Sequence, residues 1–368
     1  MQTASGDDRL YPRHGRSRAG KFGGRGESEP MRRSIRAYLW CLLAAFSPLF
    51  AEEPDLPVVE QCNPRIYHIR SVIKPVMLGS RPDDLFILTA LPQSSQYQSV
   101  SGETFSQGEI RNFPMDCGRY IFYAAKRRSS PLVREFKVTI YELHTHWDRI
   151  KKIPPPSSEM QYFTKNCGDT IDRDHPDVVK TARKLAERSS NPVEYARAAY
   201  LFVTANFKYG QCANRRLRTI WKRRHGDCGD LSAVFISLMR ARNIPARSVF
   251  AVRPDNTYHV WAEFYLDGVG WIPVDVTADL GKGGEFRHFG NYDDNCVVMH
   301  RDRGFRVHNG RKEIDLDFLQ TYSFWCYSRH RYGKVKVKMT FAGERLPAPP
   351  PRRPERADRP ENRGLKVE

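Results

Sequence analysis

Patterns that would place this 368-residue chain among metal-dependent or nucleotide-dependent proteins are absent from its sequence. There is no His-Glu-x-x-His pair and no Cys-x-x-Cys pair, which are common zinc-binding arrangements, and no glycine-rich loop that would hold phosphates. The sequence also contains no internal repeat and no nucleic-acid recognition motif. We therefore expect no metal, no organic cofactor and no nucleic-acid partner.

A hydrophobic run long enough for a comfortable membrane span is also lacking. The apolar stretch at 37–50 is shorter than the roughly 20 residues that a spanning helix needs. Basic residues precede it from position 31 and Ala51 ends it, as in a secretory signal peptide. The sequence therefore predicts a signal peptide at 31–51 and a secreted or periplasmic protein, whose membrane contact is transient and made through this segment alone.

Residues 1–30 are rich in glycine and arginine. Because the signal pattern begins at Met31, we expect this residue to be the true start, and 1–30 to be a disordered extension or an over-extended gene start. The alternative is a genuine N-terminal extension, with an uncleaved signal segment that anchors the protein in the membrane.

Acidic residues are scarce relative to basic ones. The chain has 42 Asp and Glu against 60 Lys and Arg, which gives a formal net charge of +18. Such an excess favours anionic partners, for example an acidic peptide or an anionic polymer of the cell envelope. The segment 346–368 is rich in proline and arginine, and we expect it to be disordered.

The chain has eight cysteines, of which Cys41 lies in the signal segment. Removal of that segment leaves seven, so one must stay unpaired in an oxidising compartment. Cys228 is the natural candidate for the free thiol. Up to three disulfides can join the other six, and the sequence does not fix their connectivity. These six are Cys62, Cys117, Cys167, Cys212, Cys296 and Cys326.

Cys228 lies at the expected start of a helix. Asp227 is a good N-cap residue, and five apolar residues follow at helical spacing. They are Leu231, Val234, Phe235, Leu238 and Met239. Unpaired backbone N–H groups in the first turn favour negative charge, so the position suits a thiolate and an oxyanion. We expect Gly226 and Gly229 to let a substrate approach the backbone. A buried structural cysteine is the alternative.

A β-hairpin is expected downstream of this helix. The segments 260–265 and 271–276 have strand-like alternation, and Asp267 to Gly270 forms the turn. In this pairing His259 and Asp275 come level on one face, where cross-strand Cβ atoms lie roughly 4.5–5.5 Å apart. The Asp275 carboxylate can then hold the His259 ring and leave its other nitrogen for Cys228.

These segments together resemble the bacterial transglutaminase-like superfamily over about residues 190–300. The residues that carry the resemblance are Gly226-Asp227-Cys228, Leu231-Ser232-Ala233, Ile244-Pro245-Ala246-Arg247, His259-Val260-Trp261-Ala262-Glu263 and Trp271-Ile272-Pro273-Val274-Asp275. The resemblance implies an α+β fold with a papain-like core, in which a helix carrying Cys packs on an antiparallel sheet carrying His and Asp.

The resemblance also implies roles for single residues. Cys228 would be the nucleophile, His259 the general base and acid, and Asp275 the carboxylate that orients the imidazole. The family often has an upstream aromatic residue that supports the oxyanion hole. Tyr209 is the candidate for this role, and Gln211 is a rival.

Around this core, alternating apolar and polar residues predict a small antiparallel β domain at 54–150. A proline-rich linker at 153–158 separates it from the catalytic core, expected at 156–341. We expect core helices at 176–187 and 191–206. Strands are expected at 65–73, 84–90, 118–125 and 134–146 in the β domain, and at 296–300 and 334–341 at the end of the core.

Two charged segments near the expected site have two interpretations each. The basic residues between Arg215 and His225 lead to Cys228 and would steer an anionic substrate or favour the thiolate; otherwise they form a solvated helix face. Asp293 and Asp294, in the loop 286–295, would accept a cation at the rim of the cleft; otherwise they belong to a solvated turn.

The expected function is that of an exported cysteine-dependent enzyme, which forms a thioester with the acyl part of a protein or peptide amide. Water would then give hydrolysis, and an amine would give transamidation. We prefer a protease or amidase because transamidation requires a site that excludes water. The alternative is a catalytically silent transglutaminase-like binding or scaffold module of the bacterial cell envelope.

Overall fold

The computed structural model describes residues 56–125, 130–212, 214–282, 284, 286–331 and 333–347. The extension predicted at 1–30, the signal peptide predicted at 31–51 and all but the first residues of the tail predicted at 346–368 lie outside them. Within the described ranges, no helix is long and apolar enough to cross a membrane.

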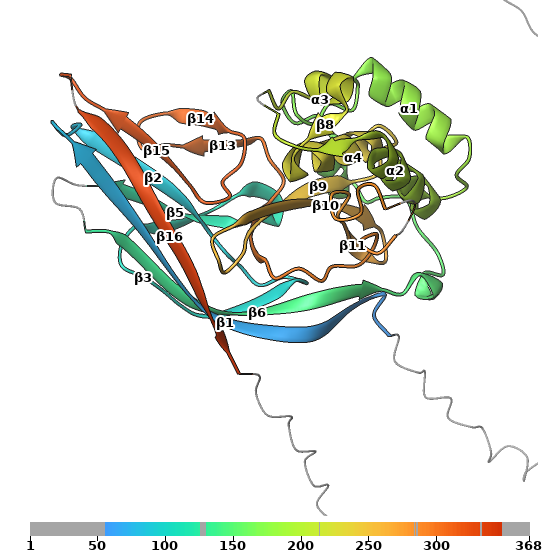
Figure 1. Cartoon of the computed structure of the whole chain (residues 1–368), viewed down its shortest axis with the longest axis horizontal. Coiled ribbons are helices and arrows are strands. Elements are labelled where there is room, and N and C mark those ends of the chain that lie inside the picture. The colour runs from blue at the N-terminus through green and yellow to red at the C-terminus, as the bar shows by residue number, and fades with distance from the viewer. Residues whose placement is uncertain are drawn as a thin grey trace, which may run out of the picture. The chain divides into compact units, whose positions relative to one another are not determined.

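The α-helices of the described part of the chain fall between residues 176 and 240, and in Figure 1 they gather at the upper right. They are α1 (Pro176–Ala186), α2 (Pro192–Asn206), α3 (Leu217–Arg223) and α4 (Cys228–Arg240). α1 and α2 each begin with proline, whose missing N–H is harmless at the first helical position. The helices predicted at 176–187 and 191–206 are confirmed.

A four-stranded antiparallel sheet lies against α4. Its order is β11-β10-β9-β12, with β9 (Ala246–Val252), β10 (Tyr258–Leu266), β11 (Gly270–Val274) and β12 (Val297–Arg301). α4 packs on β9 and β10, and α1, α2 and α3 contact it as well. Because it is enclosed in this way, α4 is buried at every residue from Gly229 to Arg240, well beyond the predicted stripe. The predicted α+β fold, with a Cys-bearing helix on an antiparallel sheet, is confirmed.

Two more four-stranded antiparallel sheets pack face to face. The first has the order β16-β1-β6-β3, with β1 (Val59–Leu78), β3 (Gln98–Phe105), β6 (Leu132–Thr145) and β16 (Lys334–Leu346). The second has the order β15-β2-β5-β4, with β2 (Asp84–Leu91), β4 (Glu109–Asn112), β5 (Arg119–Ala125) and β15 (Tyr322–Tyr327). Ile73 and Leu132 of the first sheet share a buried cluster with Ile87 and Tyr123 of the second.

The C-terminal strands belong to this sandwich, which corrects the predicted end of the catalytic core. β16 pairs with β1 from Ile66 to Leu78, and β15 pairs with β2. The expectation that 334–341 closes the core, and with it the core boundary at 341, is therefore wrong. Alternation predicts that a strand exists but not which strand it pairs with. Here Val337 and Phe341 are buried in the sandwich clusters, so β16 completes that structure.

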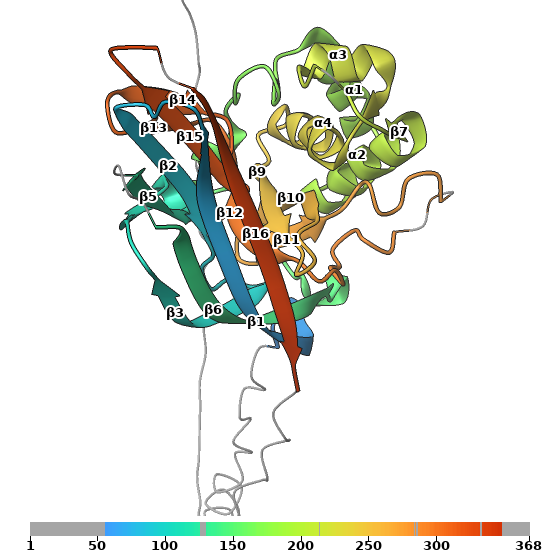
Figure 2. The ribbon, with the colours of Figure 1, turned by 60° about the vertical axis from the view of Figure 1, so that its left-hand side comes forward.

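The sheet of β9, β10, β11 and β12 lies beside the sandwich (Figure 2), and the two share hydrophobic contacts. One buried cluster joins Tyr67 and Ile69 of β1 to Val252 of β9 and Met299 of β12. Shorter elements complete the described fold. These are the strand pairs β7 (Lys208–Tyr209) with β8 (His225–Gly226) and β13 (Phe305–His308) with β14 (Glu313–Leu316), and the 3-10 helices η1 (Pro114–Asp116), η2 (Trp147–Arg149) and η3 (Met160–Thr164).

The seven cysteines of the described residues are all free thiols, so the expected disulfides are not found among them. Cys117, Cys167 and Cys296 are buried in three different hydrophobic clusters, which keeps them apart. The Cys167 thiol instead donates a hydrogen bond to the carbonyl oxygen of Arg303, at 2.8 Å.

Candidate active site

Cys228 is the first residue of α4, as predicted. The N-cap Asp227 accepts a hydrogen bond from the backbone N–H of Asp230 at 3.0 Å, and the Asp230 carboxylate accepts one from the N–H of Asp227 at 3.2 Å. This capping box fixes the start of the helix. Arg215 adds an ion pair to Asp227 at 2.5 Å. The half-buried Cys228 therefore stands at a helix mouth whose backbone is held from both sides.

The two glycines beside Cys228 differ, and only Gly226 has a packing role. A Cβ atom on Gly226 would lie 2.6 Å from the Cβ of Asp230, so this glycine makes room for the capping box. A Cβ on Gly229 would meet only ordinary contacts, the nearest at 3.5 Å. The expectation that both glycines admit substrate is therefore corrected for Gly226, which is buried.

His259 and Asp275 meet at one end of the predicted hairpin. The Nε2 atom of His259 lies 2.5 Å from Oδ2 of Asp275. The register pairs Ala262 with Val274, where the ladder ends, so Asp275 is a diagonal neighbour of His259 and is not level with it. The two residues still share a face, because both are an even number of positions from the paired residues Glu263 and Pro273.

The other oxygen of Asp275 is held by the turn that follows β11. Oδ1 accepts hydrogen bonds from the N–H and hydroxyl of Thr277 and from the N–H of Ala278, at 2.9, 2.7 and 3.2 Å. Asp and Thr two residues apart are a typical turn pair, a signal available in the sequence. Burial opposes the charge of Asp275, but His259 and these donors outweigh it and lower the pKa of Asp275 to about 2.

His259 also interacts with Cys228. Burial works to lower the pKa of His259, but the charge and hydrogen bond of Asp275, together with a hydrogen bond and charge interaction with Cys228, raise it to about 10. Because Asp275 occupies Nε2, Nδ1 is the ring nitrogen left for the thiol. The His259 ring stacks on Trp261 with centroids 5.9 Å apart. The structure thus brings Cys228, His259 and Asp275 into one chain of contacts.

Tyr209 lies beside the same thiol. The parallel pairing of β7 with β8 sets Tyr209 opposite Gly226, two residues before Cys228. Desolvation, the charges of Cys228 and Asp227, and the proximity of the Cys228 side chain raise the pKa of Tyr209. Tyr209 lines the neighbouring cavity, whereas the exposed Gln211 is not among the residues that line it.

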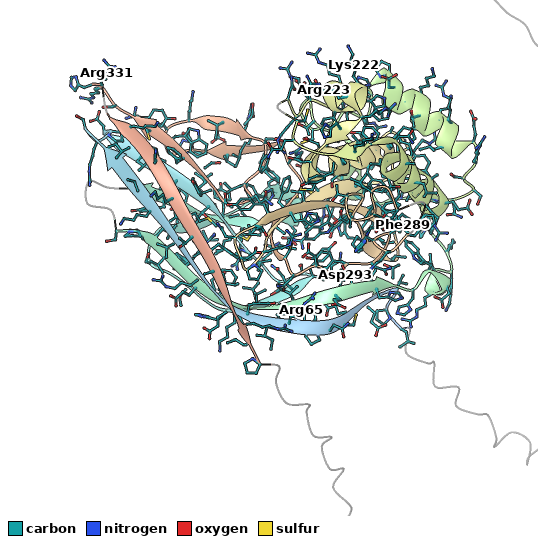
Figure 3. All side chains as sticks on the ribbon, viewed as in Figure 1. Arg65, Lys222, Arg223, Phe289, Asp293 and Arg331 are labelled. Atoms are coloured by element: carbon teal, nitrogen blue, oxygen red, sulfur yellow. The ribbon has the colours of Figure 1, made fainter. Side chains whose placement is uncertain are left out.

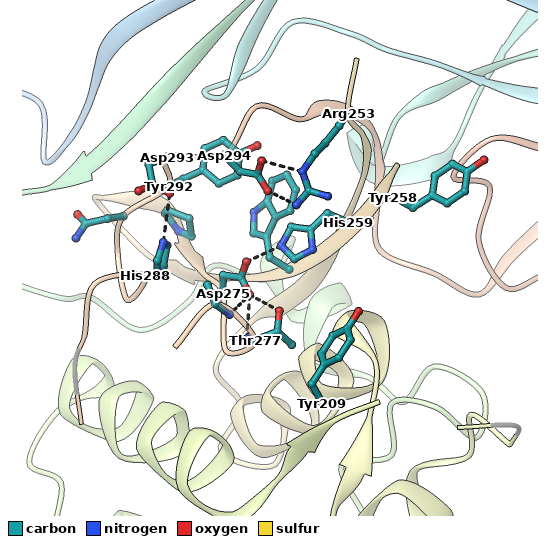
Figure 4. A pocket seen from close by; sticks show the side chains of 14 residues that line it. Tyr209, Arg253, Tyr258, His259, Asp275, Thr277, His288, Tyr292, Asp293 and Asp294 are labelled. Carbon is teal, nitrogen blue, oxygen red and sulfur yellow. Dashed lines mark hydrogen bonds and ion pairs between the residues drawn. The ribbon is translucent and has the colours of Figure 1, made fainter. Parts of the chain in front are cut away.

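A cavity of about 480 Å³ opens beside the His259–Asp275 pair (Figure 4). Exposed Tyr209 and Tyr258 and the Arg253–Asp294 ion pair line it, along with the loop that carries His288. Arg253 binds the Asp294 carboxylate through two nitrogens, at 3.0 and 2.5 Å. The cavity is mainly polar and is wide enough for part of a peptide chain.

The charged segments have specific partners. Asp294 is bound by Arg253 and Asp293 by Arg287, which disfavours the cation interpretation. No group of three His, Cys, Asp or Glu side chains is arranged to hold a metal ion within the residues that the structure describes. In the basic run, Arg215 pairs with Asp227, whereas Lys222 and Arg223 are exposed at the outer end of α3 (Figure 3).

A second histidine–aspartate network, which the sequence did not predict, holds the backbone of Asp275. His288 Nδ1 lies 2.8 Å from Asp279 Oδ1, and the hydroxyl of buried Tyr200 donates to the other oxygen of Asp279. The carbonyl oxygen of His288 accepts a hydrogen bond from the N–H of Asp275 at 3.0 Å. This network fixes the backbone that carries Asp275. Nothing in the spacing of Tyr200, Asp279 and His288 indicates that they meet.

Parts of this chain are similar to known proteins. The sequence model of the transglutaminase-like superfamily matches residues 179–276. An uncharacterised protein of Haemophilus influenzae is 35% identical over 82 residues, covering 16% of this chain and 22% of that protein. The chain therefore spans about a fifth of the length of this curated relative.

Solved structures resemble it over a longer range. A candidate cysteine protease from Cytophaga hutchinsonii matches with a TM-score of 0.54 at 17% identity, covering 79% of this chain and 94% of that one. The periplasmic domain of TgpA from Pseudomonas aeruginosa matches with a TM-score of 0.34 at 14% identity, covering 60% and 90%. This chain thus resembles the transglutaminase-like superfamily over residues 179–276, and it shares its fold with the Cytophaga structure.

Proposed function

We propose that the protein is a cysteine-dependent amide hydrolase, a protease or amidase, that acts through Cys228, His259 and Asp275. The observation that supports this most directly is the unbroken chain of contacts from Cys228 to His259 to Asp275 at the mouth of α4. A structural cysteine has no need of a histidine that is itself held by a buried carboxylate.

In the first half of the reaction, the Cys228 thiolate attacks the carbonyl carbon of an amide, and the carbonyl electrons move to its oxygen. The N–H groups at the start of α4 and the Tyr209 hydroxyl are suited to stabilise this oxyanion. When the intermediate collapses, the C–N bond breaks and His259 gives its proton to the leaving amine. A thioester on Cys228 remains.

In the second half, His259 takes a proton from water, which attacks the thioester carbonyl. The C–S bond breaks, the acid product leaves and the Cys228 thiolate is restored. Asp275 keeps the imidazole oriented with Nδ1 toward the sulfur throughout. If an amine replaces water, the product is a new amide and the reaction is a transamidation. The open, polar cavity favours water.

We also propose that the enzyme works outside the cytoplasm, in the bacterial envelope or beyond it. The support is the signal-peptide pattern at 31–51. Its substrates would be proteins or peptides, and the excess of basic residues favours acidic ones.

The test is incubation with a library of glutamine-containing peptides, with and without a labelled primary amine. We expect cleavage or deamidation by the native protein, little incorporation of the label, and no turnover by Cys228→Ala. Dominant incorporation of the label would establish a transamidase instead. Turnover that survives in Cys228→Ala, or in a protein whose Cys228 has been fully alkylated, would overturn the proposal.

A further inference from the structure

A second cavity, of about 440 Å³, opens on the face of the β9–β12 sheet that also carries His259. It includes Glu263, four residues along β10 from His259. It is lined by the loop between β2 and β3 and by residues in and beside η1 and η3. Each of the strands β9, β10, β11 and β12 contributes one side chain. Its floor carries three charged residues from adjacent strands, Arg247 of β9, Glu263 of β10 and Arg301 of β12.

Glu263 is fully buried and already has partners. Its carboxylate accepts a hydrogen bond from Arg247 Nε at 2.8 Å and one from Gln96 Nε2 at 3.1 Å. The guanidinium of Arg247 stacks on the ring of Trp271, 3.7 Å from its centroid. Arg247 and Glu263 thus form a neutral, hydrogen-bonded pair.

Arg301 is different. Its relative exposure is 4%, and its nearest carboxylate oxygen is that of Glu263, 4.0 Å from Nε. The neighbouring Asp302 is engaged by Arg240 at 2.9 Å. Among the interactions of the described residues, the Arg301 guanidinium makes no hydrogen bond. Two buried guanidinium groups therefore face one buried carboxylate at the floor of an open cavity.

A buried cation without hydrogen bonds is unfavourable unless something supplies them. A guanidinium presents its donors in a planar fork that matches a carboxylate or a phosphate. The floor of the cavity is therefore suited to an oxyanion.

Side chains at the rim of the same cavity discriminate between a carboxylate ligand and a phosphate ligand. Asp116 of η1 and Glu159 before η3 are exposed carboxylates that line it, and apolar Met115, Met160 and Phe163 lie with them. Rim carboxylates repel a doubly charged phosphate but attract an ammonium group. We propose that this cavity recognises the free α-carboxylate of a small zwitterion, an amino acid or a short peptide, with Arg301 as the carboxylate anchor and Asp116 and Glu159 as partners of the amine.

This site goes beyond the proposed function, because it requires no chemistry at Cys228. The test is calorimetric titration of the Cys228→Ala protein, which cannot turn over its ligand by the proposed route. The probes are Ala-Ala with a free carboxylate, its C-terminal amide, its N-acetyl form and inorganic phosphate. We expect the amide to bind about 10- to 100-fold more weakly than the free acid, as loss of hydrogen bonds to a charged group predicts. We expect the N-acetyl form to be weakened less.

Arg301→Gln should weaken the free acid by a similar factor, whereas Arg306→Gln, an exposed arginine on β13, should leave binding unchanged. If Arg301→Gln does not fold, the exposed pair Asp116→Asn with Glu159→Gln replaces it. That variant should reduce the advantage of the free amine over the N-acetyl form. The proposal is overturned by equal affinity for acid and amide, by no binding of any peptide at millimolar concentration, by binding of phosphate alone, or by an unchanged affinity in these variants.

Discussion

The imidazole of His259 is bound at Nε2 by Oδ2 of Asp275, 2.5 Å away, although the two residues are diagonal neighbours on the hairpin. The ladder ends at Val274, and the backbone of Asp275 is free to turn toward the histidine. Its other oxygen is held by Thr277 and Ala278. The pair is therefore fixed from both sides, and Nδ1 is the nitrogen of His259 that stays available for Cys228.

This pair should make stability depend on pH in a defined direction. The pKa of His259 is raised to about 10, so its stabilising effect is complete below its unfolded value of about 6.5 and is lost as pH rises toward 10. The pKa of Asp275 is lowered to about 2, so its effect is complete above about 4 and is lost as pH falls toward 2. Both contributions are complete between about pH 4 and 6.5.

Asp275→Asn should therefore destabilise the protein most within that window, by about 3–5 kcal/mol, as removal of one partner of a buried ion pair predicts. Urea unfolding of both proteins at pH 5, 8 and 10 measures the difference. It should shrink from pH 5 to pH 10. A difference that grows with pH would contradict the assigned charges.

Tyr209→Phe should lower kcat about 100-fold and leave KM nearly unchanged, because it removes one donor from the developing oxyanion. Tyr258→Phe is the matched control, since Tyr258 lines the same cavity and is also exposed. Steady-state kinetics on one peptide substrate compare the two. Equal effects of both changes would remove Tyr209 from the oxyanion hole.

Gly226→Ala should destabilise the protein by about 1–3 kcal/mol, because its methyl group would collide with Asp230 in the capping box. Gly229→Ala should be neutral or stabilising by about 0.5–1 kcal/mol, because its methyl group has room and alanine favours a helix. Denaturant unfolding of the two variants gives the comparison. The packing role of Gly226 is wrong if the two substitutions have the same effect.

Asp302→Asn should cost about 3–5 kcal/mol of stability, because Arg240 would keep a buried charge without its partner. Arg240 lies at the end of α4 and also donates hydrogen bonds to the carbonyl oxygens of Ala246 and Lys165, so this pair joins the helix to β12. The exposed pair Arg306–Asp315 is the control, and Asp315→Asn should not change the unfolding midpoint measurably. Similar midpoints for both variants would show that the buried pair does not hold α4.

The local signals around Cys228 were sufficient to predict α4 and the hairpin. Asp227 as a cap and the apolar spacing after it determine the helix start, and Asp267 to Gly270 determines the turn. These features depend on neighbours in sequence. The contact between His259 and Asp275 follows from the hairpin, because only 16 residues separate them.

The parts that the sequence did not predict depend on distant neighbours. β16 pairs with β1 across most of the chain, and alternation in Lys334–Leu346 says nothing about that partner. Tyr200, Asp279 and His288 meet only after α2 packs near the end of β11. The reason for Gly226 is likewise the side chain of Asp230, which folds back on it, and Cys117, Cys167 and Cys296 are kept apart by burial in separate clusters.

The most direct test of the central claim is alkylation of the native protein with iodoacetamide at pH 6, followed by mass spectrometry of every cysteine peptide. Burial raises the pKa of Cys62 and of Cys326, so both should react slowly. We predict fast, selective labelling of Cys228, slowed at least tenfold in His259→Asn, which removes the imidazolium that favours the thiolate. Slow labelling of Cys228 at the rate of Cys62 and Cys326, unaffected by His259→Asn, would contradict the account.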